Sequence, residues 1–414
     1  MPGTNEYVKH FGNIPFTERH FGDADNIALC EVFYMPLEHV VSESFDDEPL
    51  SFSDACDRLF ELNGNRHKPV GVVINRRVSE KLMRMAAMPR FADMKVLACR
   101  HVYNESPAVQ FCAATFMLPD GVSVIVFRGT DDTIAGWKED LDIYTKKTIP
   151  SYKYSVEYLE KAAEKLTGDI ILCGHSKGGN VALYAALNCS PAVADRISLL
   201  YNNDGPGFHD LRPFATPAYH ALLPRYRHFI PQSSFIGMLL AHDNDYTVIK
   251  SSRLMGLLQH DLASWQISDG RPTVTKLSLL GKLNDRGLAN IILRVSDEQS
   301  ELVNTITAAL LGSSGEKDLT GLVKNAGSSL RGINAAWRAL DSDTRKKFFA
   351  IFKGSAALLA KAAREVQKDV IVQTKVLIEQ KQTELKRKAA AKAKPLFSGH
   401  RTVFLHTSPF SSRA

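Results

Sequence analysis

The stretch Ile170 to Asn180, which reads IILCGHSKGGN, constrains the fold more than any other part of the sequence. An apolar run leads into a Gly-x-Ser-x-Gly core, and the alanine-rich segment 181–187 follows it. This order predicts a strand, a sharp turn at Ser176 and a helix. Such a turn raises the serine hydroxyl above a sheet, and its glycines permit the strand and helix to approach closely. The alternative is a chance match, because glycine and serine are common residues.

The segments around this turn alternate between strand-like and helix-like patterns. Residues 152–166 carry apolar side chains on one side, which predicts an amphipathic helix. Apolar runs predict strands at 94–100, 110–117, 122–127, 169–173, 196–201 and 226–230. Strands that alternate with helices of this length favour an α/β fold with a mostly parallel sheet and flanking helices. Together with the turn at Ser176, they make an α/β-hydrolase fold the expected architecture.

We expect the α/β-hydrolase core over 91–272, between two helical regions. Residues 1–90 predict an N-terminal helical wrap without chemistry of its own, and 273–394 predict a C-terminal helical extension. Residues 395–414 contain prolines and a glycine and are expected to be a disordered tail. Within the two helical regions, helices are expected at 26–34 with Asp25 as the cap, 51–62, 79–87, 298–311, 328–340 and 341–393.

Composition excludes several classes of protein. There is no run of 18 or more apolar residues, so we expect no transmembrane segment. The first residues lack a basic segment followed by an apolar one, so no secretory signal is expected. Six cysteines are scattered without Cys-x-x-Cys spacing, which favours reduced thiols, a cytoplasmic location and the absence of a metal site. No pattern implies an organic cofactor.

The positive charge of the chain is concentrated near its end. The net charge is +6, while residues 361–414 contain twelve lysines and arginines against four acidic residues. The remainder of the chain is therefore slightly acidic. A basic run of this kind is typical of a solvated helix end. The alternative is a weak contact with an anionic membrane or with nucleic acid.

A serine hydroxyl becomes an effective nucleophile when a histidine accepts its proton and an acid fixes the tautomer of that histidine. In α/β hydrolases these residues occur in the order Ser, then Asp or Glu, then His. The order alone does not choose among the histidines between residues 205 and 270, which are His209, His220, His228, His242 and His260.

The same chemistry needs backbone N–H groups aimed at the developing oxyanion. One should come from the residue after the serine, Lys177, and one from a loop after an earlier strand. The segment Phe127 to Thr130 (FRGT) ends a predicted core strand, and its glycine allows the backbone to approach a substrate. We therefore expect Thr130 to supply the second N–H group. The alternative is an ordinary turn at the end of a strand.

Three motifs in this order resemble those of class 3 (fungal-type) lipases: FRGT at 127–130, GWKEDL at 136–141 and GHSKGG at 174–179. A closer resemblance is to a bacterial family of α/β-hydrolase-like proteins related to these lipases. Its shared segments are 174–180, 203–208, 230–234 and 259–265, and the likeness extends over about 5–270. The resemblance implies an α/β-hydrolase fold and an activity on ester substrates.

The resemblance also narrows the choice of base and acid. It implies His260 as the general base. His242 is the second candidate, because it follows an apolar stretch and neighbours two aspartates. Class 3 lipases place their acid just after the strand at 226–230, where this chain has no carboxylate. Pancreatic-type lipases place it one strand earlier, in a turn similar to the one that contains Asp204, so Asp204 is the expected acid. The alternatives are that Asp204 only caps its turn, or that the acid is Asp243, Asp245 or Asp261.

Two further features have alternative interpretations. Lys177 replaces a leucine of the lipase motif. Its ammonium group either faces solvent, forms a salt bridge elsewhere, or lies near the cleft and favours an anionic substrate.

The apolar segment 235–241 either lines an acyl pocket, forms a lid, or is a buried core helix.

The sequence thus predicts a serine esterase of lipase type with catalytic residues Ser176, His260 and Asp204, acting on a small-molecule or lipid ester. Lys177 and Thr130 supply the oxyanion hole. Acyl transfer and thioesterase activity use the same chemistry. The rival hypothesis is a catalytically weak or inactive hydrolase-like scaffold that binds a protein or an anionic surface through its C-terminal helices and basic tail.

Overall fold

The computed structural model describes residues 3–64, 66–67, 77–242, 245–254, 256–292, 296–351 and 353–354, together with 361, 364 and 382–383. The chain divides into two compact units, Met1–Ala363 and Arg364–Ala414. The expected tail at 395–414 and most of the helix expected at 341–393 lie outside the described residues.

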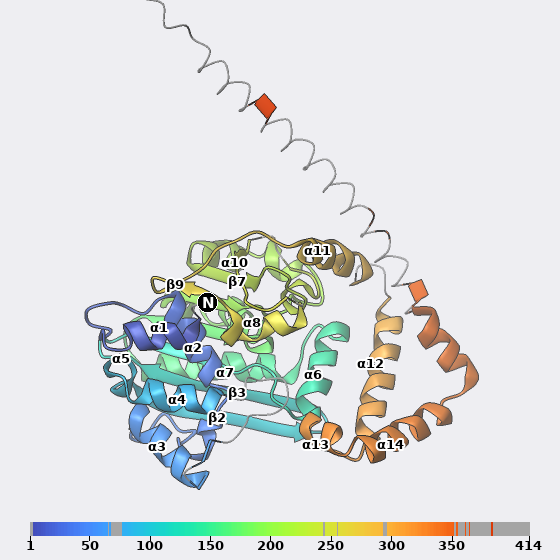
Figure 1. The fold of residues 1–414 in the computed structure, drawn as a ribbon, viewed down its shortest axis with the longest axis horizontal. Coiled ribbons are helices and arrows are strands. Elements are labelled where there is room, and N and C mark those ends of the chain that lie inside the picture. The colour runs from blue at the N-terminus through green and yellow to red at the C-terminus, as the bar shows by residue number, and fades with distance from the viewer. Residues whose placement is uncertain are drawn as a thin grey trace, which may run out of the picture. The chain divides into compact units, whose positions relative to one another are not determined.

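The first unit is built on an eight-stranded sheet whose spatial order follows the chain, β1 to β8. The strands from β1 to β4 pair antiparallel, and those from β4 to β8 pair parallel (Figure 1). The strands are β1 Leu50–Ser51, β2 Lys95–Glu105, β3 Ala108–Met117, β4 Ser123–Phe127, β5 Ile170–His175, β6 Ile197–Asn203, β7 Tyr226–Pro231 and β8 Thr247–Ile249. A small second sheet pairs β9 Ile267–Ser268 with β10 Arg271–Pro272.

All six predicted strands are confirmed, as β2 to β7, whereas β1 and β8 were not predicted. The α/β class is also confirmed. The parallel strands β4 and β5 are buried along their whole length. Strands covered on both faces are apolar without alternation, which is why these two were clear in the sequence.

Helices cover both faces of the sheet. Val124 and Val126 of β4 pack with the N-terminal helices, while Ile125 and Phe127 pack with α7 and α8. Because alternate residues of a strand point to opposite faces, the N-terminal helices form one layer and α7 and α8 the other. The helices of these layers are α1 Thr4–Phe11, α2 Asp23–Val32, α3 Phe52–Leu62, α4 Val78–Ala86, α5 Pro89–Ala92, α7 Pro150–Lys165, α8 Lys177–Asn188, α9 Pro191–Ala194 and α10 Pro217–Leu222.

The predicted N-terminal helices correspond to α2, α3 and α4, with one correction. Asp25 does not precede α2 but lies in its first turn, where its side chain accepts a hydrogen bond from the Gly22 N–H group. Ser51 caps α3, because its Oγ accepts from the Asp54 N–H group at 3.0 Å.

The C-terminal helices are α11 Leu279–Ile292, α12 Asp297–Gly312, α13 Leu319–Lys324 and α14 Ala326–Ala339. Helix α11 contacts the segment after β7, whereas α12 and α13 contact α6 (Ile134–Thr145), a helix that was not predicted, and the residues just before it. The Asn304 side chain of α12 donates to Asp142 of α6 at 2.8 Å. Just before α6, Asp132 accepts from the N–H group of Thr320 at 2.9 Å. Helices α12 and α14 match two predicted helices, and no helix among the described residues is long and apolar enough to cross a membrane.

Buried ion pairs hold the N-terminal layer together. Arg90 donates to both carboxylate oxygens of Asp25 at 2.7 Å, and Tyr7 donates to the same carboxylate at 2.6 Å. Lys81 pairs with Glu31 in the same layer. All these side chains are buried. A buried charge that loses its partner is strongly destabilising, so the layer depends on each pair remaining complete.

We expect Arg90→Ala to lower the free energy of unfolding by about 3–5 kcal/mol, because it leaves Asp25 buried without its cation. Urea denaturation followed by circular dichroism measures the effect. Arg212→Ala is the matched control: Arg212 also pairs with an aspartate, Asp210, but at the surface, so it should change stability little. Equal losses in the two variants would contradict the role assigned to the buried pair.

Candidate active site

Ser176 lies on a sharp turn between β5 and α8. Its φ is +58° and its ψ is −133°, a backbone conformation that residues other than glycine rarely adopt. Two residues later, a Cβ atom at Gly178 would collide with the backbone of Phe127 at the end of β4. Only glycine permits this approach of the helix to the neighbouring strand. The predicted strand, turn and helix are confirmed.

Asp204 follows β6, the strand beside β5, and lies next to this turn. The Ser176 N–H group donates to the carbonyl oxygen of Asn203 at 3.0 Å. The Asp204 side chain is buried, and its Oδ1 accepts from the Ser234 hydroxyl at 2.5 Å and from the Gly237 N–H group at 3.1 Å. These donors hold the carboxylate in one orientation, with Oδ2 left for a further partner.

That partner is His260, at the end of the short helix Leu257–His260. Its Nδ1 lies 2.7 Å from Asp204 Oδ2. A carboxylate accepts, so Nδ1 carries the proton, and Nε2 remains as the ring nitrogen able to accept one. The structure therefore brings together the expected acid, the expected base and the turn with the expected nucleophile.

A second chain of hydrogen bonds fixes the backbone of His260. His175 Nε2 donates to the His260 carbonyl oxygen at 2.9 Å, and His175 Nδ1 accepts from the Tyr34 hydroxyl at 2.8 Å. The rings of His175 and His260 lie 4.4 Å apart. Burial, and then the proximity of His260, hold the pKa of His175 well below its usual range, so its ring is neutral. Tyr34 belongs to the N-terminal layer, to which the sequence assigned no chemistry.

The other candidate histidines and acids lie in other surroundings. His242 Nε2 faces Asp285 at 3.5 Å, and Asp261 accepts from the Ala263 N–H group at 3.0 Å. Asp243 lies outside the described residues. Segment 235–241 is not the buried core helix that was one of the alternatives for it, because it contains only a short turn of helix, Ile236–Met238. Its Gly237 N–H group donates to Asp204.

The loop after β4 passes beside Ser176. A Cβ atom at Gly129 would lie 3.0 Å from Ser176 Cβ and would collide with the Tyr34 hydroxyl, so glycine is needed here. The next residue, Thr130, donates its hydroxyl to Asp140 of α6 at 2.7 Å. On the other side, the Lys177 N–H group is the first amide of α8 and belongs to the set that a helix cannot satisfy internally.

The Lys177 side chain forms a buried salt bridge, one of the three expected alternatives. Its Nζ lies 2.9 Å from Glu139 Oε2 and 2.8 Å from the Gln110 carbonyl oxygen. Burial alone would lower the pKa of Lys177, but Glu139 and Asp140 raise it above its usual value. The ammonium group is therefore charged and committed to Glu139, which leaves it unsuited to binding an anionic substrate.

Two adjacent acids of α6 thus hold the two residues whose N–H groups are expected at the oxyanion: Glu139 holds Lys177 and Asp140 holds Thr130. Burial raises the pKa of Asp140 to about 6. Sequence reasoning missed both contacts. The available signal was the lysine in place of the motif leucine, together with two acids in GWKEDL, since a buried lysine needs a carboxylate partner.

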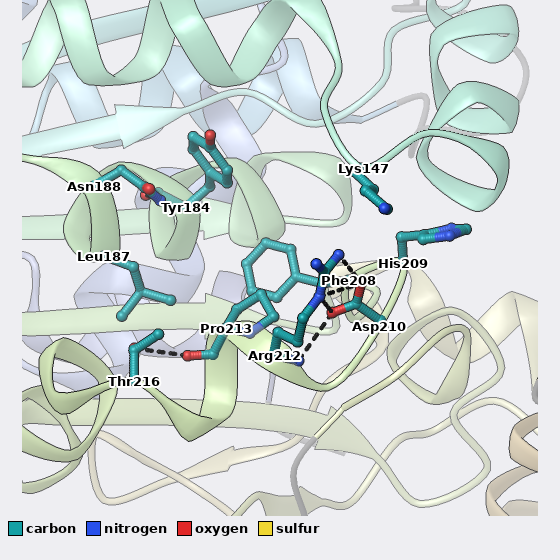
Figure 2. Close-up of a pocket in the computed structure, with 10 residues that line it drawn as sticks. All are labelled: Lys147, Tyr184, Leu187, Asn188, Phe208, His209, Asp210, Arg212, Pro213 and Thr216. Carbon is teal, nitrogen blue, oxygen red and sulfur yellow. Dashed lines mark hydrogen bonds and ion pairs between the residues drawn. The ribbon is translucent and has the colours of Figure 1, made fainter.

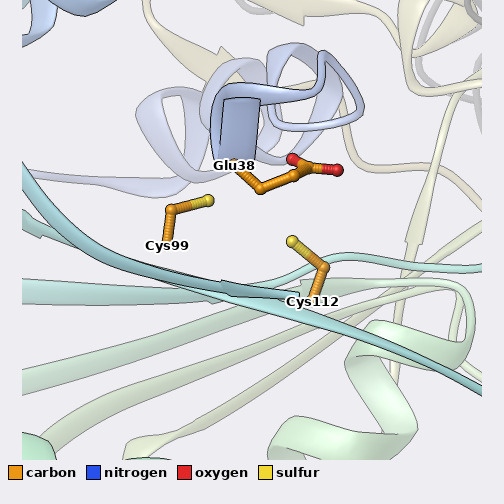
Figure 3. Close-up of side chains that lie close together, drawn as sticks. All are labelled: Glu38, Cys99 and Cys112. Atoms are coloured by element: carbon orange, nitrogen blue, oxygen red, sulfur yellow. The ribbon is translucent and has the colours of Figure 1, made fainter. Parts of the chain in front are cut away.

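One group of side chains has the spacing of a metal site. Glu38, Cys99 and Cys112 place possible ligand atoms within 4.8 Å of one another (Figure 3). However, the Arg128 guanidinium binds both oxygens of Glu38, at 2.7 and 2.6 Å. Burial also raises the pKa of the Cys112 thiol. A fixed cation and a protonated Cys112 thiol make this group a poor cation site.

A cavity of about 270 Å³ lies beside α8 (Figure 2). It runs along the second half of α8, past Tyr184, to Lys147 and the segment 208–216. None of Ser176, Asp204 and His260 lines it. The Asp210–Arg212 ion pair forms part of its lining.

Comparisons with known proteins identify one matching family and similar solved structures. The model of a family described as Mbeg1-like matches residues 85–307. Two similar solved structures are the native Rhizomucor miehei lipase propeptide complex and a deletion mutant of that complex. The native complex is 17% identical to this chain, covers 53% of it and has a TM-score of 0.31. The mutant is 15% identical, covers 55% and has a TM-score of 0.32. In each case the match covers 68% of the other chain. No curated protein matches the chain.

Lys177→Met should lower the free energy of unfolding by about 3–5 kcal/mol, because Glu139 is then buried without its cation. Adding Glu139→Gln removes the uncompensated charge and should restore most of the loss. Chemical denaturation of the two single variants and the double variant gives the coupling energy. The matched control is Lys161→Met, which breaks an exposed pair with Glu164. A double variant as unstable as Lys177→Met would contradict the pairing.

Asp140→Asn should raise the melting temperature at pH 8 and change it little at pH 4. The folded pKa of about 6 lies above the ordinary aspartate value of 3.8, so the folded state binds protons more tightly. Stability from Asp140 is therefore full below pH 4 and lost as pH rises through 6. The control is Asp210→Asn, since Arg212 lowers the pKa of Asp210 to about 2, and that variant should not gain stability at pH 8. Thermal melts across this pH range test the difference.

Proposed function

The chain belongs to the Mbeg1-like family, which is lipase-related, and on that premise we propose that it is a serine hydrolase that cleaves carboxylic esters through Ser176, His260 and Asp204. The observation that carries the proposal is the 2.7 Å bond between Asp204 and His260 beside the turn at Ser176. An α/β-hydrolase fold is part of the proposal, supported by the parallel strands β4 to β8 with the nucleophile turn after β5.

In this mechanism, His260 Nε2 accepts the hydroxyl proton as Ser176 Oγ attacks the ester carbonyl carbon. The resulting tetrahedral intermediate collapses, and His260 returns the proton to the leaving alcohol, which leaves an acyl group on Ser176. Water then repeats the attack with the same base, and the carboxylic acid is released. No step requires a metal or an organic cofactor.

The surroundings of each group suit its role. Asp204 fixes the Nδ1–H tautomer of His260 and stabilises the imidazolium that forms. The N–H groups of Lys177 and Thr130 would donate to the oxyanion, and the N-terminus of α8 adds a partial positive charge there. The side chains of both residues are tied to α6, so the donors would need little reorganisation during the reaction.

The scaffold hypothesis gains no support from the described geometry. The feature in its favour was the absence of a carboxylate after β7, the position at which class 3 lipases have their acid. Asp204, one strand earlier, provides a carboxylate with a direct bond to His260. A hydrogen-bonded acid and base beside a strained serine favour a hydrolase over a protein that only binds.

A fluorophosphonate probe tests the proposal, because it labels a serine that is activated for attack. The wild-type protein should gain one probe mass, and Ser176→Ala should gain none. Asp204→Asn should slow labelling by up to about 10⁴-fold, the loss in kcat when a triad aspartate is replaced by asparagine. Asp261→Asn is the matched control, because Asp261 neighbours His260 in sequence but binds Ala263. Unlabelled wild-type protein beside a labelled lipase standard would overturn the proposal.

A further inference from the structure

Six large apolar side chains are exposed near His260, and we call them the apolar rim. Leu254 is 92% exposed and Val274 is 66% exposed. The complete set is Leu254, Leu257, Leu258, Val274, Leu279 and Leu280. A cluster of this kind is costly in water, because apolar surface is normally covered on folding.

The two segments that carry the apolar rim lie side by side. A Cβ atom at Gly256 would lie 3.7 Å from the Leu280 side chain, at the start of α11. Further along, the Lys250 N–H group donates to the carbonyl oxygen of Thr273 at 2.8 Å. The exposed leucines of 254–258 and those at the start of α11 therefore form one continuous surface.

This surface is attached directly to the proposed catalytic residues. Leu257 and Leu258 belong to the same short helix as His260. The Asn284 side chain of α11 donates to the Ser234 carbonyl oxygen at 2.7 Å, and the Ser234 hydroxyl donates to Asp204. A molecule that lies against the apolar rim would therefore lie beside the segments that hold Asp204 and His260.

The charges within the same two segments are all positive. Residues 250–258 and 273–282 contain Lys250, Arg253, Lys276 and Lys282 and no acidic residue. Lys250, Arg253 and Lys276 are exposed. A second copy of this surface, or the basic C-terminal tail, would bring like charges together. An apolar surface with cations around it instead complements an anionic lipid bilayer, whose headgroups attract lysine and arginine.

We propose that the apolar rim, with Lys250, Arg253 and Lys276, docks on an anionic lipid bilayer, and that ester substrates reach Ser176 from that surface. The identity of the substrate rests on the proposed function, whereas docking does not. The inference differs from an anionic contact through residues 361–414, because it assigns the membrane contact to the surface beside the candidate active site.

Vesicle sedimentation of the full chain carrying Ser176→Ala tests docking without hydrolysis. The protein should sediment with phosphatidylcholine vesicles that contain phosphatidylglycerol, and less with phosphatidylcholine alone. Leu257→Ser combined with Leu258→Ser should weaken binding by about tenfold or more, since two leucines no longer enter the bilayer. Arg253→Gln combined with Lys276→Gln should weaken it by a similar factor and reduce its dependence on salt.

Two control variants separate the alternatives. Leu62→Ser removes a leucine that is 59% exposed on α3 and should leave binding unchanged. Substituting Lys386, Arg387 and Lys388 by glutamine tests the C-terminal tail. Docking through the apolar rim is overturned if only the tail variant loses binding, or if the double leucine variant binds as well as its parent.

Two further measurements complete the test. Light scattering should give the same particle mass for the parent protein and the double leucine variant. A lower mass for the variant would show instead that a second copy of the chain covers the apolar rim. Fluorophosphonate labelling of the leucine variant with Ser176 intact should match the wild type. Failure of docking with normal labelling would overturn this inference and leave the proposed function in place.

Discussion

The hydrogen bond between Asp204 and His260 is the interaction on which the rest of the site depends. It joins the end of β6 to a segment that comes 56 residues later. It lies beside Ser176 because β5, which precedes Ser176, and β6 are neighbours in the sheet. The carboxylate keeps its orientation because Ser234 and Gly237 donate to its other oxygen. The His260 backbone is fixed separately, through His175 and Tyr34. Ring and backbone of the base are thus held from different layers of the molecule.

The other side of Ser176 is organised by α6. Glu139 and Asp140 are adjacent in sequence, yet one holds the residue after the nucleophile and the other holds the loop after β4. This arrangement accounts for the lysine at position 177, because a buried cation and a buried anion on neighbouring elements fix their relative position. It also connects the site to two of the C-terminal helices, since α12 binds α6 and the first turn of α13 binds Asp132, just before α6.

Much of the core could be predicted from sequence because its strands are buried on both faces and its turn motif is local. The approach of Gly178 to β4, for example, follows from the strand–turn–helix pattern itself. The contacts of Lys177 and Tyr34 could not be predicted, because each depends on which distant segment packs against it. Helix α6 was missed for a similar reason: its sequence carries a motif but no clear apolar period. For Asp204 and His260, the residue types came from a family resemblance, and only the tertiary structure brings them within bonding distance.

Several unfavourable local features occur at the same edge of the sheet. Ser176 and Asp204 both have positive φ, at 58° and 52°, although neither is glycine. Asp140 carries a charge where burial raises its pKa to about 6. A sheet that only needed to fold could avoid each of these costs with glycine at the turns and a neutral side chain on α6. Strain of this kind persists where the surrounding structure enforces it and where function requires the geometry. Positive φ at both Ser176 and Asp204, which follow neighbouring strands of the sheet, is therefore an argument in favour of the proposed catalytic role that does not depend on their hydrogen bonds.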